Sequence, residues 1–181
     1  MRKELDEALC AKYPLIFRDR NAPMTDTAMC WGFSCGDGWY DIIDVLCSKL
    51  YSHYNQANDR YQSLLETGVG NTLWGTKVVT QEMLDEAKEK MEHERGHVPV
   101  AVQVKEKFGG LRFYVNGAID EHYNYISFAE SMSYRTCEEC GAPGKRYTDG
   151  WHRVLCDVHA EMDGRDNDIE DDGDEIGRAH V

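Results

Sequence analysis

Apolar residues recur at intervals of three or four positions in several stretches of this chain, which is the spacing of amphipathic helices. The longest apolar face begins at Trp39 and continues to Tyr54, and we expect this helix to carry the core with Asp37 as its N-cap. Thr80 is a suitable N-cap for a more polar surface helix, whereas residues 71–79 show no clear period and are expected to form a loop. The predicted helices span residues 2–11, 39–54, 81–95 and 121–134.

Between the last two helices the period changes from helical to alternating, which predicts a β-hairpin. Valine occupies every second position from Val98 to Val104, and the alternation resumes at Leu111. Gly109 and Gly110 stand between the two runs, where a two-residue turn needs the backbone freedom of glycine. The hairpin is therefore expected to turn at these two glycines.

This register gives the hairpin one apolar face, interrupted by Glu106, and one basic face. Lys107 is expected to face Arg112 and Lys105 to face Tyr114, so that three cations and one aromatic ring share a surface. Like charges opposite each other are mildly destabilising, and a bound phosphate with a stacked base would offset the repulsion. A solvated outer face, or an edge protected by lysine, is the alternative explanation.

Two pairs of candidate metal ligands follow the last helix. Cys137 and Cys140 form a Cys-x2-Cys pair, and after fifteen residues Cys156 and His159 form a Cys-x2-His pair. Each two-residue gap allows one turn to aim two donors at a single point, as in a tetrahedral structural zinc site. We therefore expect these four residues to bind Zn2+ as a structural cofactor, with no open position for catalysis.

Together these features predict an α+β fold. A hairpin or small antiparallel sheet should pack on helices, with a C-terminal zinc knuckle of treble-clef or zinc-ribbon type. We expect an α+β body over residues 1–135, a zinc knuckle packed on it over residues 136–160, and an acidic tail over residues 161–181.

Charge restricts the class of protein. The chain has 181 residues, a formal net charge of −13 and a pI near 4.9, which disfavours general binding to nucleic-acid backbones. The acidic tail holds nine Asp and Glu against Arg165 and Arg178, so part of the negative charge is concentrated there.

The compartment is inferred from what the chain lacks. No apolar run is long enough to span a membrane, and the first residues lack the apolar centre of a signal peptide, so we expect a cytoplasmic protein. In a reducing compartment the cysteines outside the zinc site are expected to be buried thiols. These cysteines are Cys10, Cys30, Cys35 and Cys47.

Three sequence blocks resemble those of a group of small uncharacterised phage and prophage proteins. The blocks are Cys35-Gly36-Asp37-Gly38-Trp39-Tyr40, the segment Lys105–Tyr114, and the Cys-x2-Cys and Cys-x2-His pairs with their intervening Gly150-Trp151. The resemblance covers residues 30–160, with the acidic tail and the segment 68–80 outside it. It implies a phage origin and a cytosolic role in the infected host cell, and it implies no catalytic residues.

The first functional hypothesis is a binding protein without catalysis. Its ligand would be a small nucleotide-like anion, which in a phage protein would be a host defence signal. A homodimer would offer one way to complete the binding face. The expected ligand-binding residues are Lys105, Lys107, Arg112, Tyr114 and Arg135.

Two other classes of function stay open at this point. The acidic surface and tail would suit an interaction module or nucleic-acid mimic that inhibits a host protein. An enzyme would be a zinc-stabilised nuclease, for which His152 is the candidate base. The chain lacks the adjacent His or Asn ligands that such chemistry needs between the two ligand pairs, so we favour binding over catalysis.

Overall fold

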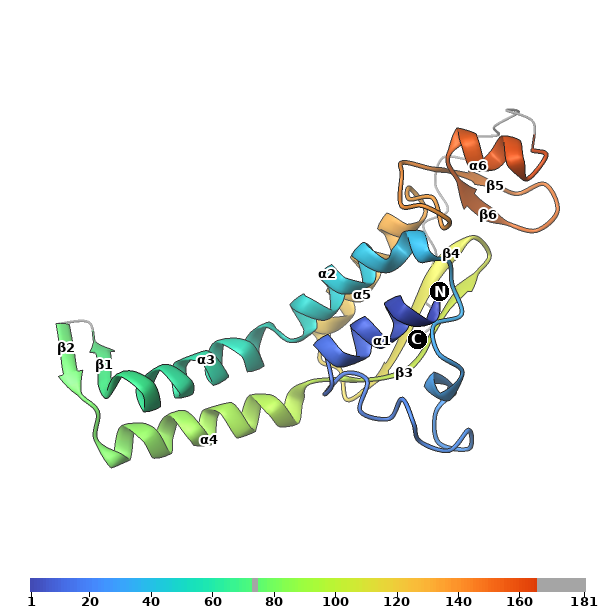
Figure 1. The fold of residues 1–181 in the computed structure, drawn as a ribbon. Helices are drawn as coiled ribbons and strands as arrows, with labels where there is room; N and C mark the ends of the chain where they lie inside the picture. Colours follow the sequence, from blue (N-terminus) through green and yellow to red (C-terminus); the bar gives the residue numbers. More distant parts are fainter. Residues whose placement is uncertain (73–74, 166–181) are drawn as a thin grey trace.

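A helical arm and a small C-terminal module extend in different directions from a central body (Figure 1). The computed structural model describes residues 1–72 and 75–165. Within these residues helices alternate with three two-stranded antiparallel sheets, one in each part of the molecule. The predicted α+β class is therefore confirmed.

The body combines the N-terminal segment with the central hairpin. Helices α2 and α5 pack against each other, and α5 packs on strand β4. In chain order the body contains α1 (Lys3–Lys12), the 3-10 turns η1 (Ala28–Trp31) and η2 (Asp37–Trp39), α2 (Tyr40–Leu50), β3 (Val100–Lys107), β4 (Gly110–Asn116) and α5 (Asp120–Ser133).

The predicted core helix differs from the structure at both ends. Asp37 does not cap it, because the Asp37 carboxylate pairs with Arg2 at 2.7 Å and the residue begins a 3-10 turn. The helix is also interrupted at Tyr51, where α2 ends and α3 starts. The sequence pattern did not reveal this break, because apolar residues recur at helical spacing in both α2 and α3 and both helices bury them.

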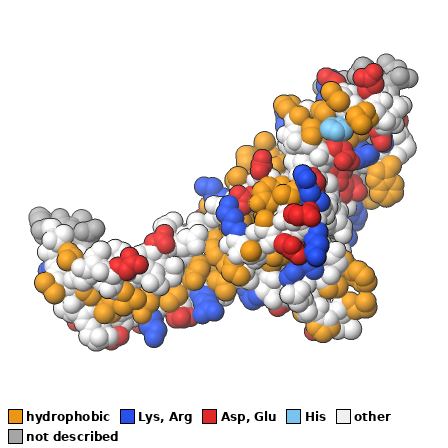
Figure 2. Space-filling view, viewed as in Figure 1, with side chains coloured by type: hydrophobic (Ala, Val, Ile, Leu, Met, Phe, Trp, Pro, Cys, Tyr) orange, Lys and Arg blue, Asp and Glu red, His pale blue; other side chains and the backbone are white. Residues whose placement is uncertain are grey.

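The arm consists of α3 (Ser52–Thr67) and α4 (Gln81–His97), with hydrophobic side chains along its length (Figures 1 and 2). Thr80 caps α4 as predicted, since its Oγ1 accepts from the Met83 N–H at 3.3 Å. At the tip, β1 (Val69–Thr72) pairs with β2 (Gly75–Val78). The prediction of a loop over residues 71–79 is therefore wrong.

The central hairpin turns at Phe108 and Gly109, one residue earlier than predicted. Both residues have positive φ, 54° and 77°, as a type I′ turn requires. The prediction placed Gly109 and Gly110 in the turn because an aromatic residue rarely adopts positive φ. Gly110 is instead the first residue of β4, where a Cβ would overlap the ring of Tyr134.

This turn shifts the register of the strands by two residues. Lys105 lies opposite Arg112 rather than Tyr114, and Lys107 lies opposite Gly110. A shift of two preserves the alternation of side chains, so both faces keep their predicted composition from Gln103 to Lys107 and from Gly110 to Tyr114. A bulge between Ala101 and Gln103 changes it further from the turn, where Ala101 is fully buried and Val102 is only partly buried. The apolar face is buried through Val104, Leu111 and Phe113.

Both edges of the hairpin are occupied by other segments of the body. On the β3 side, the backbone of Ser34 donates one hydrogen bond and accepts another, at 3.0 and 2.8 Å. On the β4 side, the side chains of Ser133 and Glu130 accept from the backbone N–H groups of Leu111 and Phe113 at 2.8 and 2.9 Å. The strands thus satisfy edge hydrogen bonds within this chain.

One apolar core lies between the helices of the body and the hairpin, and a smaller one lies in the C-terminal module. Trp39 is fully buried in the first, while its Nε1 donates to the carbonyl oxygen of Thr136 at 2.9 Å. The smaller cluster contains Cys137, Tyr147, Leu155 and Ala160. Trp39 therefore connects the core of the body with the chain that enters the module.

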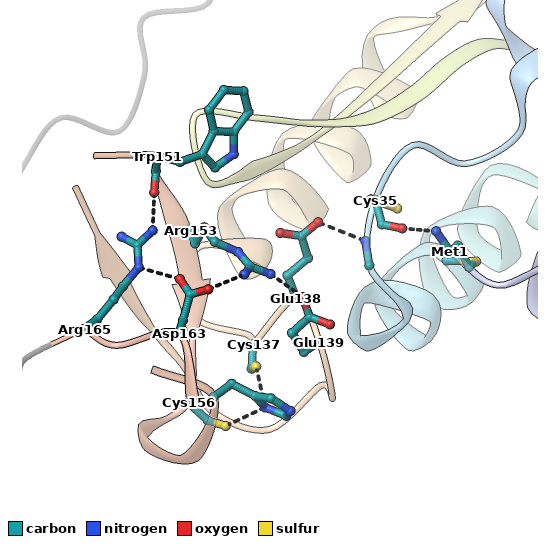
Figure 3. Close-up of polar contacts among 12 residues, drawn as sticks. Met1, Cys35, Cys137, Glu138, Glu139, Trp151, Arg153, Cys156, Asp163 and Arg165 are labelled. Atoms are coloured by element: carbon teal, nitrogen blue, oxygen red, sulfur yellow. Dashed lines mark hydrogen bonds and ion pairs between the residues drawn. The ribbon is translucent and has the colours of Figure 1, made fainter. Parts of the chain in front are cut away.

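Gly36 and Gly38 bring the backbone of the body directly against the backbone of the module. Gly36 N–H donates to the Glu138 carboxylate at 2.9 Å (Figure 3). Gly38 N–H donates to the carbonyl of Glu138 at 2.8 Å. A Cβ on Gly36 would overlap the Glu138 carbonyl, and one on Gly38 would overlap the Cys137 carbonyl. Glycine is therefore needed at both positions for this contact.

We expect Gly38→Ala to destabilise the protein by about 2 kcal/mol or more, because backbone atoms on both sides of the contact must separate. Gly96→Ala is the matched control, since a Cβ at Gly96 meets nothing within 4 Å and Gly96 lies in a helix. It should be neutral or stabilising by about 0.5–1 kcal/mol. Urea unfolding of both variants tests this, and equal stabilities would contradict it.

Candidate metal centre and basic hairpin face

The first two candidate ligands lie in a tight turn that follows α5. Cys137 N–H donates to the carbonyl of Ala142 at 2.8 Å, and Gly141 N–H donates to the carbonyl of Cys137 at 2.9 Å. Gly141 adopts a φ of 78°, in the left-handed region that glycine tolerates best. This compact turn directs the side chains of Cys137 and Cys140 toward one point.

A short hairpin and a short helix supply the second pair of candidate ligands. The hairpin consists of β5 (Lys145–Tyr147) and β6 (Arg153–Leu155), and it leads into α6 (Asp157–Met162). Cys156 directly precedes α6, and His159 lies in its first turn. The order of cysteine turn, hairpin and helix is that of a treble-clef motif. In a zinc ribbon, the other predicted motif, both pairs of ligands would lie in turns of the first kind.

The four ligand atoms converge to within 4.8 Å of one another. The Sγ atoms of Cys140 and Cys156 are 3.8 Å apart, and His159 Nδ1 lies 3.5 Å from Cys137 Sγ and 3.2 Å from Cys156 Sγ. A tetrahedral zinc-sized ion requires sulfur atoms about 3.8 Å apart and sulfur about 3.5 Å from nitrogen, from metal–ligand bonds of about 2.3 and 2.05 Å. The four side chains therefore fit a single metal ion.

The Cys156 thiol is well suited to bind a metal ion. A hydrogen bond from the backbone N–H of His159, assisted by the His159 ring and the neighbouring cysteines, lowers the pKa of Cys156 to about 7. Because the thiolate is the form that binds metal, less free energy is needed to deprotonate this ligand at neutral pH.

Ion pairs brace the side of the module opposite the candidate ligands (Figure 3). Arg153 pairs with Asp163 at 3.1 Å and also with Glu139, which stands between the first two cysteines. Arg165 pairs with Asp163 at 2.8 Å and donates to the carbonyl of Trp151 at 2.6 Å. These contacts connect the start of the module with its end.

The module therefore extends further along the chain than its predicted end at residue 160. Asp163 and Arg165 belong to the segment that was expected to be an acidic tail, yet both form these ion pairs. Residues 166–181, which carry most of the predicted tail, lie outside the described residues.

The hairpin residues predicted to bind a ligand share one face of β3 and β4. Lys105 Nζ lies 5.6 Å from the ring centre of Tyr114, and Arg112 donates to the hydroxyl of Tyr134 at 2.8 Å. Lys107 is exposed near the turn. The structure therefore brings Lys105, Lys107, Arg112 and Tyr114 together as the sequence analysis predicted, although with other cross-strand partners.

Tyr134 and Arg146 complete this surface, and Tyr134 was not identified from the sequence. The guanidinium carbons of Arg112 and Arg146 lie 5.8 and 5.3 Å from the Tyr134 ring centre, distances at which a cation interacts with a ring. Arg146 also donates to the carbonyl of Phe108 at 3.2 Å. We define the basic hairpin face as Lys105, Lys107, Arg112, Tyr114, Tyr134 and Arg146.

No sequence signal would have identified Tyr134. It follows the last turn of α5 and belongs to no periodic pattern. Its role depends on the module, which places Arg146 beside the hairpin. An aromatic residue between two arginines that are distant in sequence can be recognised only after the fold is known.

Arg135 and His152 do not belong to the basic hairpin face. Arg135 is exposed after α5, and within the described residues no contact joins its side chain to the hairpin. His152 Nδ1 lies 3.3 Å from Arg146, and its ring lies 6.2 Å from that of Phe108. The residue expected to be a nuclease base thus neighbours a cation rather than a carboxylate.

Comparison of the chain with models of protein families, with curated proteins and with solved structures finds no significant match. Among the described residues, no helix has both the length and the apolar character needed to cross a membrane. Function must therefore be inferred from the two sites themselves.

Removing the metal should unfold the module before the body, because the four ligand side chains would then lose the ion that holds the cysteine turn and the start of α6 together. Cys140→Ser should have the same effect, whereas Cys30→Ser should not, since Cys30 lies outside the cluster. Amide hydrogen exchange of residues 136–165 measures this directly. Unchanged protection after complete chelation would contradict a structural role for the metal.

Proposed function

We propose that the protein binds a nucleotide-like anion on its basic hairpin face, and that a structural zinc ion holds the module which completes this face. Three thiolates and one imidazole nitrogen form a donor set that favours Zn2+ among the common metals. All four positions of a tetrahedral ion are filled by the protein, so we assign the zinc a structural role.

The observation that carries the proposal is an unneutralised group of cations in a protein with a net charge of −13. In the C-terminal module, carboxylates pair with Lys145, Arg153 and Arg165. Across residues 1–72 and 75–165, no ion pair involves the four cations of the basic hairpin face, which are Lys105, Lys107, Arg112 and Arg146. These cations are therefore available to an external anion.

The register of the hairpin strengthens this proposal. Lys105 and Arg112 face each other directly across the strands, where like charges are destabilising by a few tenths of a kcal/mol. Glu130, whose charge interacts with Arg112 without forming an ion pair, accepts a hydrogen bond from the Phe113 N–H at 2.9 Å. A phosphate group bridging Lys105 and Arg112 would convert this repulsion into two charge-assisted hydrogen bonds.

The rings of the face provide the second part of a nucleotide site. Tyr114 is 41% exposed and lies beside Lys105, while Tyr134 lies against Arg112 and Arg146. An exposed tyrosine ring can stack on any of the nucleobases, and each stacked base contributes about 1–3 kcal/mol to the free energy of binding. Charge for the phosphate and a ring for the base therefore occur on one surface.

The face is open to solvent, since Lys107, Tyr114 and Arg146 are exposed. Two surface hollows, of about 310 and 260 Å³, lie elsewhere: one beside Lys12 and Asp44 of the body, the other beside Leu64 and Met83 at the tip of the arm. An open surface suits a ligand with several phosphates or nucleotides better than a single one. In the phage context implied by the sequence resemblance, such a ligand would be a host signal that the protein sequesters.

We expect Arg112→Ala and Lys105→Ala each to weaken the binding of a fluorescent single-stranded oligonucleotide by about tenfold, because each removes a charge-assisted phosphate contact. Lys88→Ala on the exposed side of α4 removes the same charge far from the face and should change affinity by less than about twofold. Fluorescence anisotropy at two salt concentrations gives these affinities, and unlabelled nucleoside triphosphate as competitor tests the smaller ligand.

Two results would overturn the proposal. One is an absence of saturable binding by the wild-type protein to the oligonucleotide and to nucleoside triphosphate. The other is equal affinity of the Arg112→Ala, Lys105→Ala and Lys88→Ala proteins, because the position of a positive charge on the protein would then not matter for ligand binding. Circular dichroism of each variant confirms that the fold is retained.

A further inference from the structure

Two histidines lie four residues apart in the last turns of α4. The sequence there is His93-Glu94-Arg95-Gly96-His97, and residues at this spacing are neighbours on one face of a helix. The rings of His93 and His97 have centroids 4.3 Å apart and an interplanar angle of 36°. Both residues are exposed, and neither belongs to the metal centre or to the basic hairpin face.

A hydrogen bond of one of the two rings favours the tautomer that binds metals. His97 Nδ1 lies 2.7 Å from the carbonyl oxygen of His93, and because a carbonyl only accepts, this nitrogen carries the proton. The Nε2 of His97 therefore keeps its lone pair. His93 Nδ1 lies 3.9 Å from the carboxylate of Glu94, which is too far for a hydrogen bond but places a negative charge beside the ring. An outer carboxylate or carbonyl on one ring nitrogen is typical of metal-binding histidines.

The electrostatic surroundings also favour a cation. Helix α4 contains six acidic residues against Lys88, Lys90 and Arg95. Arg95 is itself engaged by Glu92 at 3.6 Å. The pair stands at the C-terminal end of a helix of 17 residues, where the partial charge of the helix is negative.

We propose that His93 and His97 bind one divalent transition-metal ion, of the class of Ni2+, Cu2+ or Zn2+, through their Nε2 atoms. Two imidazole rings that share such an ion have centroids about 5 Å apart, from metal–nitrogen bonds of about 2.05 Å and a bond angle of about 100°. The observed separation of 4.3 Å is within about 1 Å of this value.

The site binds a metal but lacks the parts of a peptidase. His-Glu-x-x-His on a helix is also the pattern of zinc metalloproteases, in which a third protein ligand completes the site. Among the described residues, the one group of three or more clustered His, Cys, Asp or Glu donors is the Cys137, Cys140, Cys156 and His159 cluster. The ion on α4 would therefore be held by two protein ligands and by solvent.

A metal at this position would stabilise the base of the arm. The two ligands span the last turn of α4, which contains Gly96, a residue that weakens a helix by about 1 kcal/mol relative to alanine. Val98 and Pro99 then lead directly into β3. An ion that holds both rings thus fixes the helix end from which the arm leaves the body.

The test is a titration of the full chain, with its Cys/His centre already loaded, using Ni2+ as the probe. Isothermal titration calorimetry should show one Ni2+ bound per chain, and His93→Gln and His97→Gln should each weaken this binding at least tenfold. His53→Gln is the matched control: His53 is also exposed and near a carboxylate, at 3.2 Å from Glu121, but has no histidine at helical spacing. It should leave the affinity unchanged.

Metal analysis by native mass spectrometry distinguishes the two metal sites, because the ion of the Cys/His cluster should remain bound throughout the titration. Ni2+ should also raise the thermal midpoint of the wild-type protein and not that of the double variant His93→Gln/His97→Gln. Absence of saturable Ni2+ binding would overturn the proposal. Equal affinity of the wild-type and double-variant proteins would do the same, since the ion would then bind elsewhere.

Discussion

The backbone contact between Gly36, Gly38 and the first cysteine turn connects the two halves of this structure. On one side, the neighbouring Trp39 is buried in the core of the body; on the other, Cys137 is one of four candidate metal ligands. A Cβ on Gly36 or Gly38 would overlap the backbone of this turn, so the contact depends on glycine at both positions and on the core that holds the tryptophan. Folding of the small module and packing of the large body are therefore interdependent, which a metal site on a flexible tail would not require.

The metal centre could be predicted from the sequence because its information is local. Two-residue gaps fix the geometry of each pair whatever the rest of the chain does, and the distances in the structure agree with one tetrahedral ion. The composition of the hairpin faces near the turn was also predictable, because alternation survives a shift of two residues, whereas the bulge between Ala101 and Gln103 was not. The position of the hairpin turn was not predictable. Phe108 adopts a positive φ, which sequence preferences disfavour, while Gly110 is used in β4, where it packs on the ring of Tyr134.

The parts that could not be predicted depend on contacts between distant segments. Arg146 joins the hairpin only because the module docks on the glycines of the body, and it then shares the ring of Tyr134 with Arg112. The end of the module was misplaced for a related reason. Arg165 appears in sequence to be an exception within an acidic stretch, but in the fold it completes an ion-pair network with Asp163. The net charge of the chain predicts neither feature. Among the described residues, opposite charges form ion pairs in the C-terminal module, whereas the cations of the basic hairpin face form none.

The occupied edges of the central hairpin limit how any partner can approach it. A peptide that binds by strand addition needs a free row of backbone N–H and C=O groups, but here Ser34 covers part of one edge, while Ser133 and Glu130 cover part of the other. Neither edge can therefore be extended along its full length without first displacing this chain's own residues. The same arrangement makes edge-to-edge aggregation of the hairpin unfavourable and leaves its face as the accessible surface for recognition.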